Sequence, residues 1–228
     1  MSNRPNYGSK SAPRPRPAAE SVPIWQRPIV WIGALVVVAA IGAAAIAATG
    51  SDDEPAVDQT AYAELLGTPL PRLAEPDTSV GTPAPGIEGT TMAGESIEFT
   101  SGDGTARLVG FFAHWCPVCQ REVPVVVDWL SNRQMPAGVE ILAVSTSVDP
   151  DGQNYPPSSW FERENWPTSV IRDTSESDLA TGFGLPGYPY WVAIDAAGNV
   201  AARVSGALDP TGLDALLAVI TPAAGAEE

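Results

Sequence analysis

Residues 107–119 read RLVGFFAHWCPVC, an apolar run that leads directly into two cysteines three positions apart. The first seven residues have the length and apolar content of a buried β-strand. Pro117 suits the first turn of a helix, because its fixed φ is helical and an N–H group would have no intrahelical partner there. The sequence therefore predicts a strand that ends just before Cys116 and a helix, carrying apolar side chains over 119–130, that begins beside it.

Segments of strand and helix length alternate along the rest of this region. Strands are expected at 87–99 (a hairpin that turns at Ala93-Gly94), 139–145, 169–172, 190–195 and 200–204. Helices are expected at 158–164, with Ser158 or Ser159 as N-cap, and at 176–181 and 211–220. This order predicts an α/β fold in which helices flank a mixed central sheet.

The two cysteines lie where the central helix is predicted to begin. Unpaired amides and the helix dipole favour a thiolate at a helix N-terminus, so Cys116 is the expected nucleophile. Cys119, one turn further in, is expected to be less exposed and to resolve a mixed disulfide. The offset of three residues allows the sulfurs to bridge, so the pair can cycle between dithiol and disulfide. A static disulfide, two structural thiols and a copper(I)-binding dithiol are the alternatives.

Charge and cysteine content exclude several classes of protein. The chain has 27 acidic and 12 basic residues, and five of the basic residues but only one acidic residue precede Ile29. A body that acidic repels phosphate backbones, which excludes nucleic-acid binding by the main domain. Two cysteines and a single histidine are too few for a disulfide scaffold, a four-thiolate zinc site or an iron–sulfur cluster. No metal or other cofactor is expected beyond a redox-active Cys116–Cys119 disulfide.

An uncharged apolar run at 29–48 is long enough, as a helix, to cross the hydrocarbon core of a bilayer. Basic residues precede it and acidic residues follow it, so the N-terminus is predicted to be cytoplasmic and the rest extracytoplasmic. A cleaved signal peptide is the alternative, with the small residues Ala43, Ala45 and Ala47 near the cleavage site.

The remaining regions complete the predicted organisation of the chain. Residues 1–28 are expected to form a disordered basic tail in the cytoplasm. Residues 49–79 read as a linker rich in Pro, Ala and acidic residues, with one short helix near 62–66. The folded domain is expected over 80–222, and a disordered tail over 223–228.

Three stretches of the domain carry a family resemblance: FFAHWCPVCQREVP at 111–124, VGTPAPG at 80–86, and GYPYWVAID at 187–195. Together they resemble the membrane-anchored, thioredoxin-like thiol-disulfide oxidoreductases of the TlpA/ResA type. The resemblance implies a thioredoxin-like fold outside the cytoplasmic membrane, behind one transmembrane helix. It also implies reduction of protein disulfides, in apocytochrome c or other exported proteins, by a cysteine pair that a membrane redox partner recycles. A disulfide-forming oxidant is the nearest alternative, since Pro-Val between the cysteines does not fix the reduction potential.

The resemblance assigns catalytic roles to three residues. It makes Cys116 the attacking thiol and Cys119 the resolving thiol, and it matches Glu122 to the acidic residue behind the thiols. Glu122 follows Cys119 by three positions and so shares its helical face, where a carboxylate could accept or deliver a proton. An ordinary solvated glutamate is the alternative. Gly110 stands where ordinary thioredoxins carry a buried aspartate, which shifts proton handling to Glu122 or water.

Four further residues are expected to contact substrate. The resemblance assigns Pro189 as a cis-proline beside the thiols, where the backbone of Tyr188 could pair with a substrate strand. Trp115 and Pro117 are expected to form the substrate-facing rim next to the cysteines. His114 is expected either to favour the thiolate as an imidazolium or to face solvent at the end of the strand.

Overall fold

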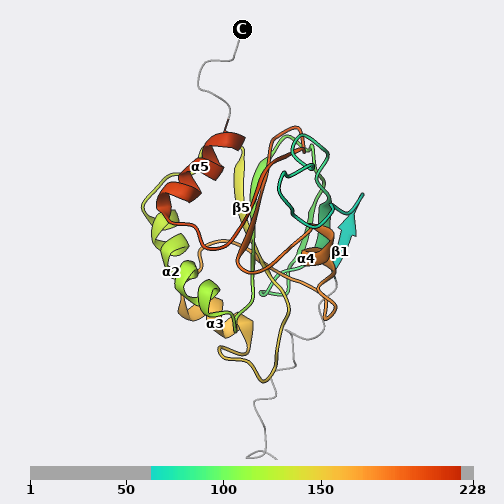
Figure 1. Cartoon of the computed structure of the whole chain (residues 1–228). Helices are drawn as coiled ribbons and strands as arrows, with labels where there is room; N and C mark the ends of the chain where they lie inside the picture. Colours follow the sequence, from blue (N-terminus) through green and yellow to red (C-terminus); the bar gives the residue numbers. More distant parts are fainter. Residues whose placement is uncertain (1–62, 222–228) are drawn as a thin grey trace, which may run out of the picture. The chain divides into compact units, whose positions relative to one another are not determined.

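The computed structural model describes residues 63–221 and has a five-stranded central sheet (Figure 1). Its strand order is β6-β5-β4-β7-β8. The strands are β4 (Ala106–Phe112), β5 (Val139–Ser145), β6 (Val170–Arg172), β7 (Tyr190–Ile194) and β8 (Val200–Ser205). β4, β5 and β6 run parallel, whereas β7 and β8 are antiparallel to their neighbours. The predicted mixed sheet is confirmed.

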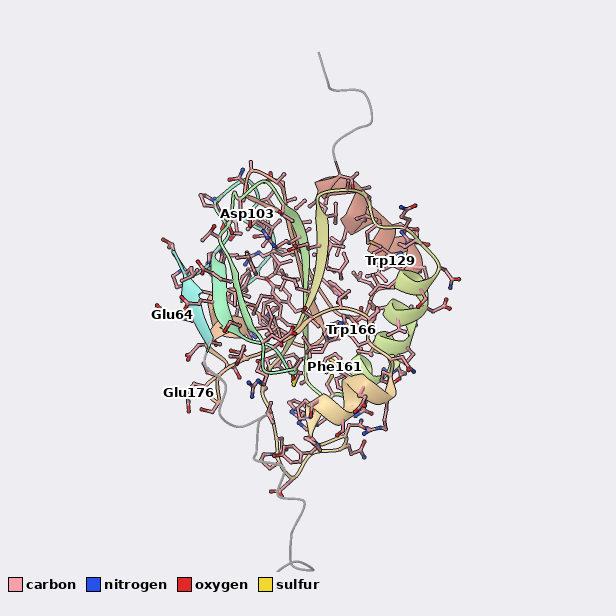
Figure 2. The ribbon with its side chains drawn as sticks, turned by 180° about the vertical axis from the view of Figure 1, so that it is seen from behind. Glu64, Asp103, Trp129, Phe161, Trp166 and Glu176 are labelled. Carbon is pink, nitrogen blue, oxygen red and sulfur yellow. The ribbon has the colours of Figure 1, made fainter. Side chains whose placement is uncertain are left out.

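The two faces of this sheet are covered differently, as Figure 1 shows. The helices are α2 (Pro117–Ser131), α3 (Pro157–Arg163), α4 (Asp178–Gly182) and α5 (Pro210–Ile220). One core cluster joins α2, α3 and α5 to the sheet, and the other joins α4 and a smaller sheet to its opposite face. Figure 2 shows Trp129 and Phe161 on the first side and Glu64 on the second.

Strand β4 lies in the middle of the sheet and is covered on both faces, which explains its continuous apolar sequence. Leu108 and Phe112 pack in the cluster with α2 and α5. Val109 and Phe111 pack in the cluster on the other face. The packing of β4 on both faces therefore fixes the position at which α2 begins.

The smaller sheet is antiparallel, with strand order β1-β2-β3. Its strands are β1 (Ala63–Leu66), β2 (Gly86–Thr90) and β3 (Ser96–Phe99). The predicted hairpin turn is confirmed, because Gly94 adopts φ +79° and its N–H donates to the carbonyl of Thr91 at 3.0 Å. Beyond β2, the N–H of Met92 donates to Val170 O at 2.8 Å, so the chain covers the short edge strand β6.

Residues 63–79 belong to the folded domain, so the predicted domain boundary at residue 80 was placed too late. Residues 63–66, for which a helix was predicted, form β1 and pair with β2, with Leu65 opposite Ile87. Their sequence, AELL, favours a helix locally, but pairing with the edge of β2 satisfies their backbone groups and overrides that preference. Leu70 is buried, and its N–H donates to Gly182 O at 2.8 Å.

A buried guanidinium fixes the rest of this segment. Arg203 on β8 donates from Nε to Asp77 Oδ2 at 2.9 Å and pairs with the other carboxylate oxygen through Nη2. It also donates to Ser79 Oγ and Pro71 O, both at 2.8 Å. The hydrogen bond from Arg203 lowers the pKa of Asp77, although partial burial opposes the shift. One side chain therefore holds most of the 71–79 segment against the central sheet.

Two further expectations concern segment ends. Helix α3 begins at Pro157 with Pro156 as its N-cap, so neither Ser158 nor Ser159 caps it. A proline already supplies the φ required in the first turn.

Several predicted segments lie outside the described residues: the transmembrane helix (29–48), the tails 1–28 and 223–228, and linker residues 49–62. Within 63–221, no helix has the length and apolar character needed to cross a bilayer.

Candidate active site

Cys116 is the N-cap residue of α2. Its backbone is extended (φ −74°, ψ 118°), and Pro117 follows as the first helical residue, as the sequence predicts. The N–H of Cys116 donates to Ala113 O at 3.0 Å, which ties the turn between β4 and the helix. Cys116 therefore lies at the N-terminal end of the helix, which carries the positive end of the helix dipole.

Cys119 lies one turn further along α2, and both cysteines are free thiols in this structure. Cys119 is completely buried, whereas Cys116 is 7% exposed. Burial raises the pKa of the Cys119 thiol well above its ordinary value. The neighbouring Cys116 and Glu122 raise it further, while a hydrogen bond with the backbone of Ala113 opposes the shift. Both cysteines are therefore buried, but Cys116 keeps a small exposed area whereas Cys119 has none, and the Cys119 thiol stays protonated.

Glu122 follows on the same face of α2 and is 1% exposed, so it is not a solvated surface residue. Its Oε1 accepts hydrogen bonds from Trp191 Nε1 at 3.1 Å and from the Leu208 N–H at 2.7 Å. Its Oε2 is buried without a hydrogen-bond partner. Burial raises the pKa of Glu122 to about 7, although the two hydrogen bonds oppose the shift. The carboxyl group can therefore gain or lose a proton near neutral pH.

The position of Trp191 explains the glycine at 110. Gly110 on β4 and Trp191 on β7 are register partners, and the indole lies over the glycine. A Cβ at Gly110 would come within 2.9 Å of two atoms of the Trp191 ring. The space in which ordinary thioredoxins place an aspartate side chain is therefore filled by the indole that orients Glu122.

The predicted rim residues surround this end of α2. Pro117 is exposed, Trp115 and Tyr188 are half-buried, and Pro189 is buried. The Tyr188–Pro189 peptide bond is cis, as the resemblance implied. The rings of Trp115 and Tyr188 meet edge to face, with centroids 5.8 Å apart and planes at 81°. Both rings pack against the core cluster that contains the two cysteines.

His114 does neither of the things expected from the sequence. Its ring is completely buried, and Nδ1–H donates to Gln153 O at 2.6 Å. Its Nε2 accepts from the Asp149 N–H at 3.1 Å, which only the neutral ring can do. His114 therefore neither faces solvent nor supplies an imidazolium to Cys116. It holds the segment that follows β5 against the active-site turn.

Two contributors to the site were not identified from the sequence. Trp191 is buried in the core, and it also orients Glu122. Ser147 was not singled out, yet it contacts both Trp115 and Tyr188. No local pattern marks either contact, because each joins strands or loops that are far apart in the sequence. In the described part of the chain, no group of three or more His, Cys, Asp or Glu side chains could hold a metal ion.

Comparisons with known proteins agree with this geometry. A model of the AhpC/TSA family matches residues 80–203. The thiol-disulfide oxidoreductase ResA of Bacillus thuringiensis is 26% identical over 143 residues, which cover 63% of this chain and 79% of that protein. The thiol:disulfide interchange protein HelX of Rhodobacter capsulatus is 25% identical over 138 residues, or 59% of this chain and 73% of HelX.

A solved structure shows the same fold. It is described as a thiol:disulfide interchange protein DsbE from Chlorobium tepidum, with a TM-score of 0.51 and 18% identity, and the match covers 68% of this chain and 99% of that one. Fold, dithiol and relatives together define a thiol-disulfide oxidoreductase of the thioredoxin fold. The chain belongs to the AhpC/TSA family, and its named relatives place it with the TlpA/ResA-like proteins.

Proposed function

We propose that this protein reduces disulfides in exported proteins, with Cys116 as the attacking thiol and Cys119 as the resolving thiol. The observation that carries this proposal is the difference between the two sulfurs. Cys116 caps the helix and is 7% exposed, whereas Cys119 is completely buried and its pKa is raised. Only the first can meet a protein disulfide, and only the second is kept out of reach of a competing substrate.

The reaction proceeds through two exchanges that balance in electrons. The Cys116 thiolate attacks one sulfur of the substrate disulfide, forms a mixed disulfide, and releases the other substrate sulfur as a thiolate that takes up a proton. Cys119 then loses its proton and attacks the Cys116 sulfur. The Cys116–Cys119 disulfide forms, the second substrate thiol leaves, and two electrons have passed from the pair to the substrate.

Glu122 takes part as the proton acceptor for Cys119. The second exchange requires a thiolate from a thiol whose pKa is raised, so a base must act nearby. Glu122 lies one turn beyond Cys119 on the same helix face, has one unpaired buried oxygen, and has a pKa of about 7. We therefore assign the ionised carboxylate as the group that removes the proton from Cys119.

The Glu122→Gln variant is expected to resolve mixed disulfides roughly 100-fold more slowly at neutral pH. The amide oxygen can still accept from Trp191 and Leu208, so the fold should be retained. In the wild type, the resolution rate should rise as pH increases through about 7, where Glu122 ionises, and the variant should lack this inflection. Stopped-flow release of the second thiol across the pH range measures both.

Folding stability provides an independent test of the ionisation of Glu122. A carboxyl group whose pKa is raised on folding stabilises the fold while protonated, and this contribution is lost as pH rises through the folded-state pKa. Wild-type stability should therefore decline as pH increases from about 4.5 to about 7, and Glu122→Gln should remove that decline. Asp128→Asn, an exposed carboxylate on the same helix, is the matched control. A decline in stability that persists in Glu122→Gln would show that another group causes it, and resolution rates that are unchanged in Glu122→Gln across the pH range would remove this residue from the mechanism.

The reductive direction and the location rest on the resemblance and on the sequence of the N-terminal region. TlpA/ResA-type proteins are held at the outer side of the cytoplasmic membrane, and the apolar run at 29–48 supplies a candidate anchor. A reductant in that compartment requires electrons from the membrane. We therefore include a membrane redox partner that returns the cysteine pair to the dithiol.

Trapping on Cys116 tests the substrate class. In the full-length Cys119→Ser variant, the mixed disulfide cannot be resolved, so partners should remain covalently attached to Cys116. Mass spectrometry of the adducts is expected to identify exported proteins, and Cys116→Ser/Cys119→Ser should give none. A lack of any Cys116-dependent adduct would contradict the proposal.

The redox state of the pair in cells tests the direction. Rapid acid quenching and thiol alkylation should find the wild-type pair mainly as the dithiol if the protein is a reductant. A pair found mainly as disulfide, together with a trapped quinone-linked oxidase, would establish the disulfide-forming alternative instead. Stoichiometric retention of Cu(I) without catalysis of exchange would establish a copper-binding dithiol.

A further inference from the structure

Ser147 occupies an unusual position directly behind the active-site rim. It lies two residues after the end of β5. Its backbone has φ +49°, in the left-handed region that residues other than glycine rarely adopt. A serine keeps this backbone conformation only when the surrounding structure imposes it. Here the surroundings are the two aromatic residues beside Cys116.

Two polar groups of Ser147, its carbonyl and its hydroxyl, bind these aromatic residues. Its carbonyl oxygen accepts from Trp115 Nε1 at 2.7 Å. Its hydroxyl shares a short hydrogen bond with the Tyr188 hydroxyl and a second, at 2.9 Å, with Ser177 Oγ. Trp115 comes from the turn before α2, and Tyr188 from the segment before β7. Ser147 is thus one residue that binds two rings from different parts of the chain.

The segment after Ser147 is also fixed to the active-site turn. His114 binds the backbone of Asp149 and Gln153, as described above, and Asn154 Nδ2 donates to His114 O at 3.3 Å. Gly152 lies so close that an added Cβ would be 2.9 Å from the Trp115 Cβ. Ser147 therefore belongs to a segment that is anchored at several points and can hold the rings in place.

The placement of the two rings has a consequence for substrates. Trp115 directly precedes Cys116, and Tyr188 directly precedes the cis-proline. Because both rings pack beside the cysteines, a polypeptide disulfide that reaches Cys116 must pass against them. A small disulfide needs far less of this surface, since its reacting sulfur has little structure attached on either side.

We propose that Ser147 is a positioning residue that holds Trp115 and Tyr188 in the geometry that binds polypeptide substrates, without acting on the cysteines themselves. This inference rests on the proposed thiol-disulfide exchange. Ser147 sets the affinity for an extended substrate, and Cys116, Cys119 and Glu122 set the rate of chemistry. Its removal should therefore affect large and small disulfides differently.

The test compares two disulfides with the reduced protein. One is a short peptide closed by an internal disulfide, and the other is the small aromatic disulfide 5,5′-dithiobis(2-nitrobenzoic acid). Ser147→Ala loses the hydroxyl that binds Tyr188, and the second-order rate constant with the peptide should fall roughly 3- to 10-fold, the worth of one hydrogen bond. The half-saturating peptide concentration should rise while the limiting rate is unchanged. The rate with the small disulfide should remain at the wild-type value.

Two further variants separate positioning from folding. Ser147→Gly also loses the hydroxyl, but glycine adopts φ +49° without strain, so the variant should fold and still show the peptide defect. Asp151→Ala changes an exposed residue of the same segment and should leave both rates unchanged. Tyr188→Phe removes the same hydrogen bond from the other side, and combining it with Ser147→Ala should add no further loss.

Each remaining outcome overturns a specific claim. If Ser147→Ala slows both disulfides equally, or neither, or if Asp151→Ala matches it, Ser147 is not a positioning residue and the exchange chemistry stands. If the wild type reacts with neither disulfide, the proposed function itself is wrong.

Discussion

Thiol-disulfide exchange is expected to fall to the uncatalysed background when Cys116 is replaced by serine. A serine hydroxyl is not ionised at neutral pH and cannot form a disulfide, so the first exchange has no nucleophile. Cys119 cannot substitute for it, because that thiol is completely buried and its raised pKa keeps it protonated. Release of thiol from a disulfide-bonded peptide, followed with the reduced variant, measures the loss.

The Cys116→Ser change should leave the structure intact, so the loss can be assigned to chemistry. Serine is close to cysteine in size and is favoured at the N-cap position that Cys116 occupies. Thermal unfolding and far-UV circular dichroism should therefore match the wild type. Exchange that persists above background in a folded Cys116→Ser variant would show that Cys119 can attack substrates directly.

The largest effect on stability is expected from Asp77→Asn. Arg203 is buried, and its side chain donates to Asp77, Ser79 and the Pro71 carbonyl. Removing the carboxylate leaves a buried guanidinium without its counter-charge, which costs about 3–5 kcal/mol. Urea unfolding should show a free energy of unfolding that is lower by this amount, with partial exposure of the 63–79 segment to proteolysis before global unfolding.

The pH dependence of this pair follows from the lowered pKa of Asp77. A carboxylate whose pKa is lowered on folding contributes stability above its unfolded-state pKa and loses it as pH falls through the folded-state pKa. The difference between wild type and Asp77→Asn should therefore be full at neutral pH and shrink below pH 3.8. Glu140→Gln is the control, because Glu140 is half exposed and Arg107 keeps its pairing with Asp103; the change there should stay below about 1 kcal/mol. Equal effects of the two substitutions would contradict the role assigned to Arg203.

The elements around the cysteines could be predicted because their signals are local. The apolar run of β4 and the proline at 117 place strand and helix on either side of Cys116, and Gly94 marks the hairpin turn. The 63–79 segment could not be predicted in this way. Its fold depends on pairing with β2 and on Arg203, which lies 126 positions from Asp77.

The active site shows the same division. The cysteines are close in sequence, and their helical offset already relates them; Glu122 joins them on the same face of α2. The burial that raises the Glu122 pKa is set by other elements, including Trp191 on β7 and Leu208 before α5. His114 illustrates the limit most clearly, because its partners are backbone atoms of a loop 35 and 39 residues away. Hydrogen bonds to backbone atoms do not depend on which residues supply them, so the sequence does not predict these partners.

The unequal chemistry of the two sulfurs is the central claim, and selective alkylation tests it most directly. Fully reduced wild-type protein is treated with less than one equivalent of iodoacetamide at neutral pH, and mass spectrometry locates the label. Because Cys116 caps the helix and keeps 7% exposure, while Cys119 is completely buried with a raised pKa, nearly all of the label is expected on Cys116. Label that is shared equally between the two cysteines, or found mainly on Cys119, would contradict the account.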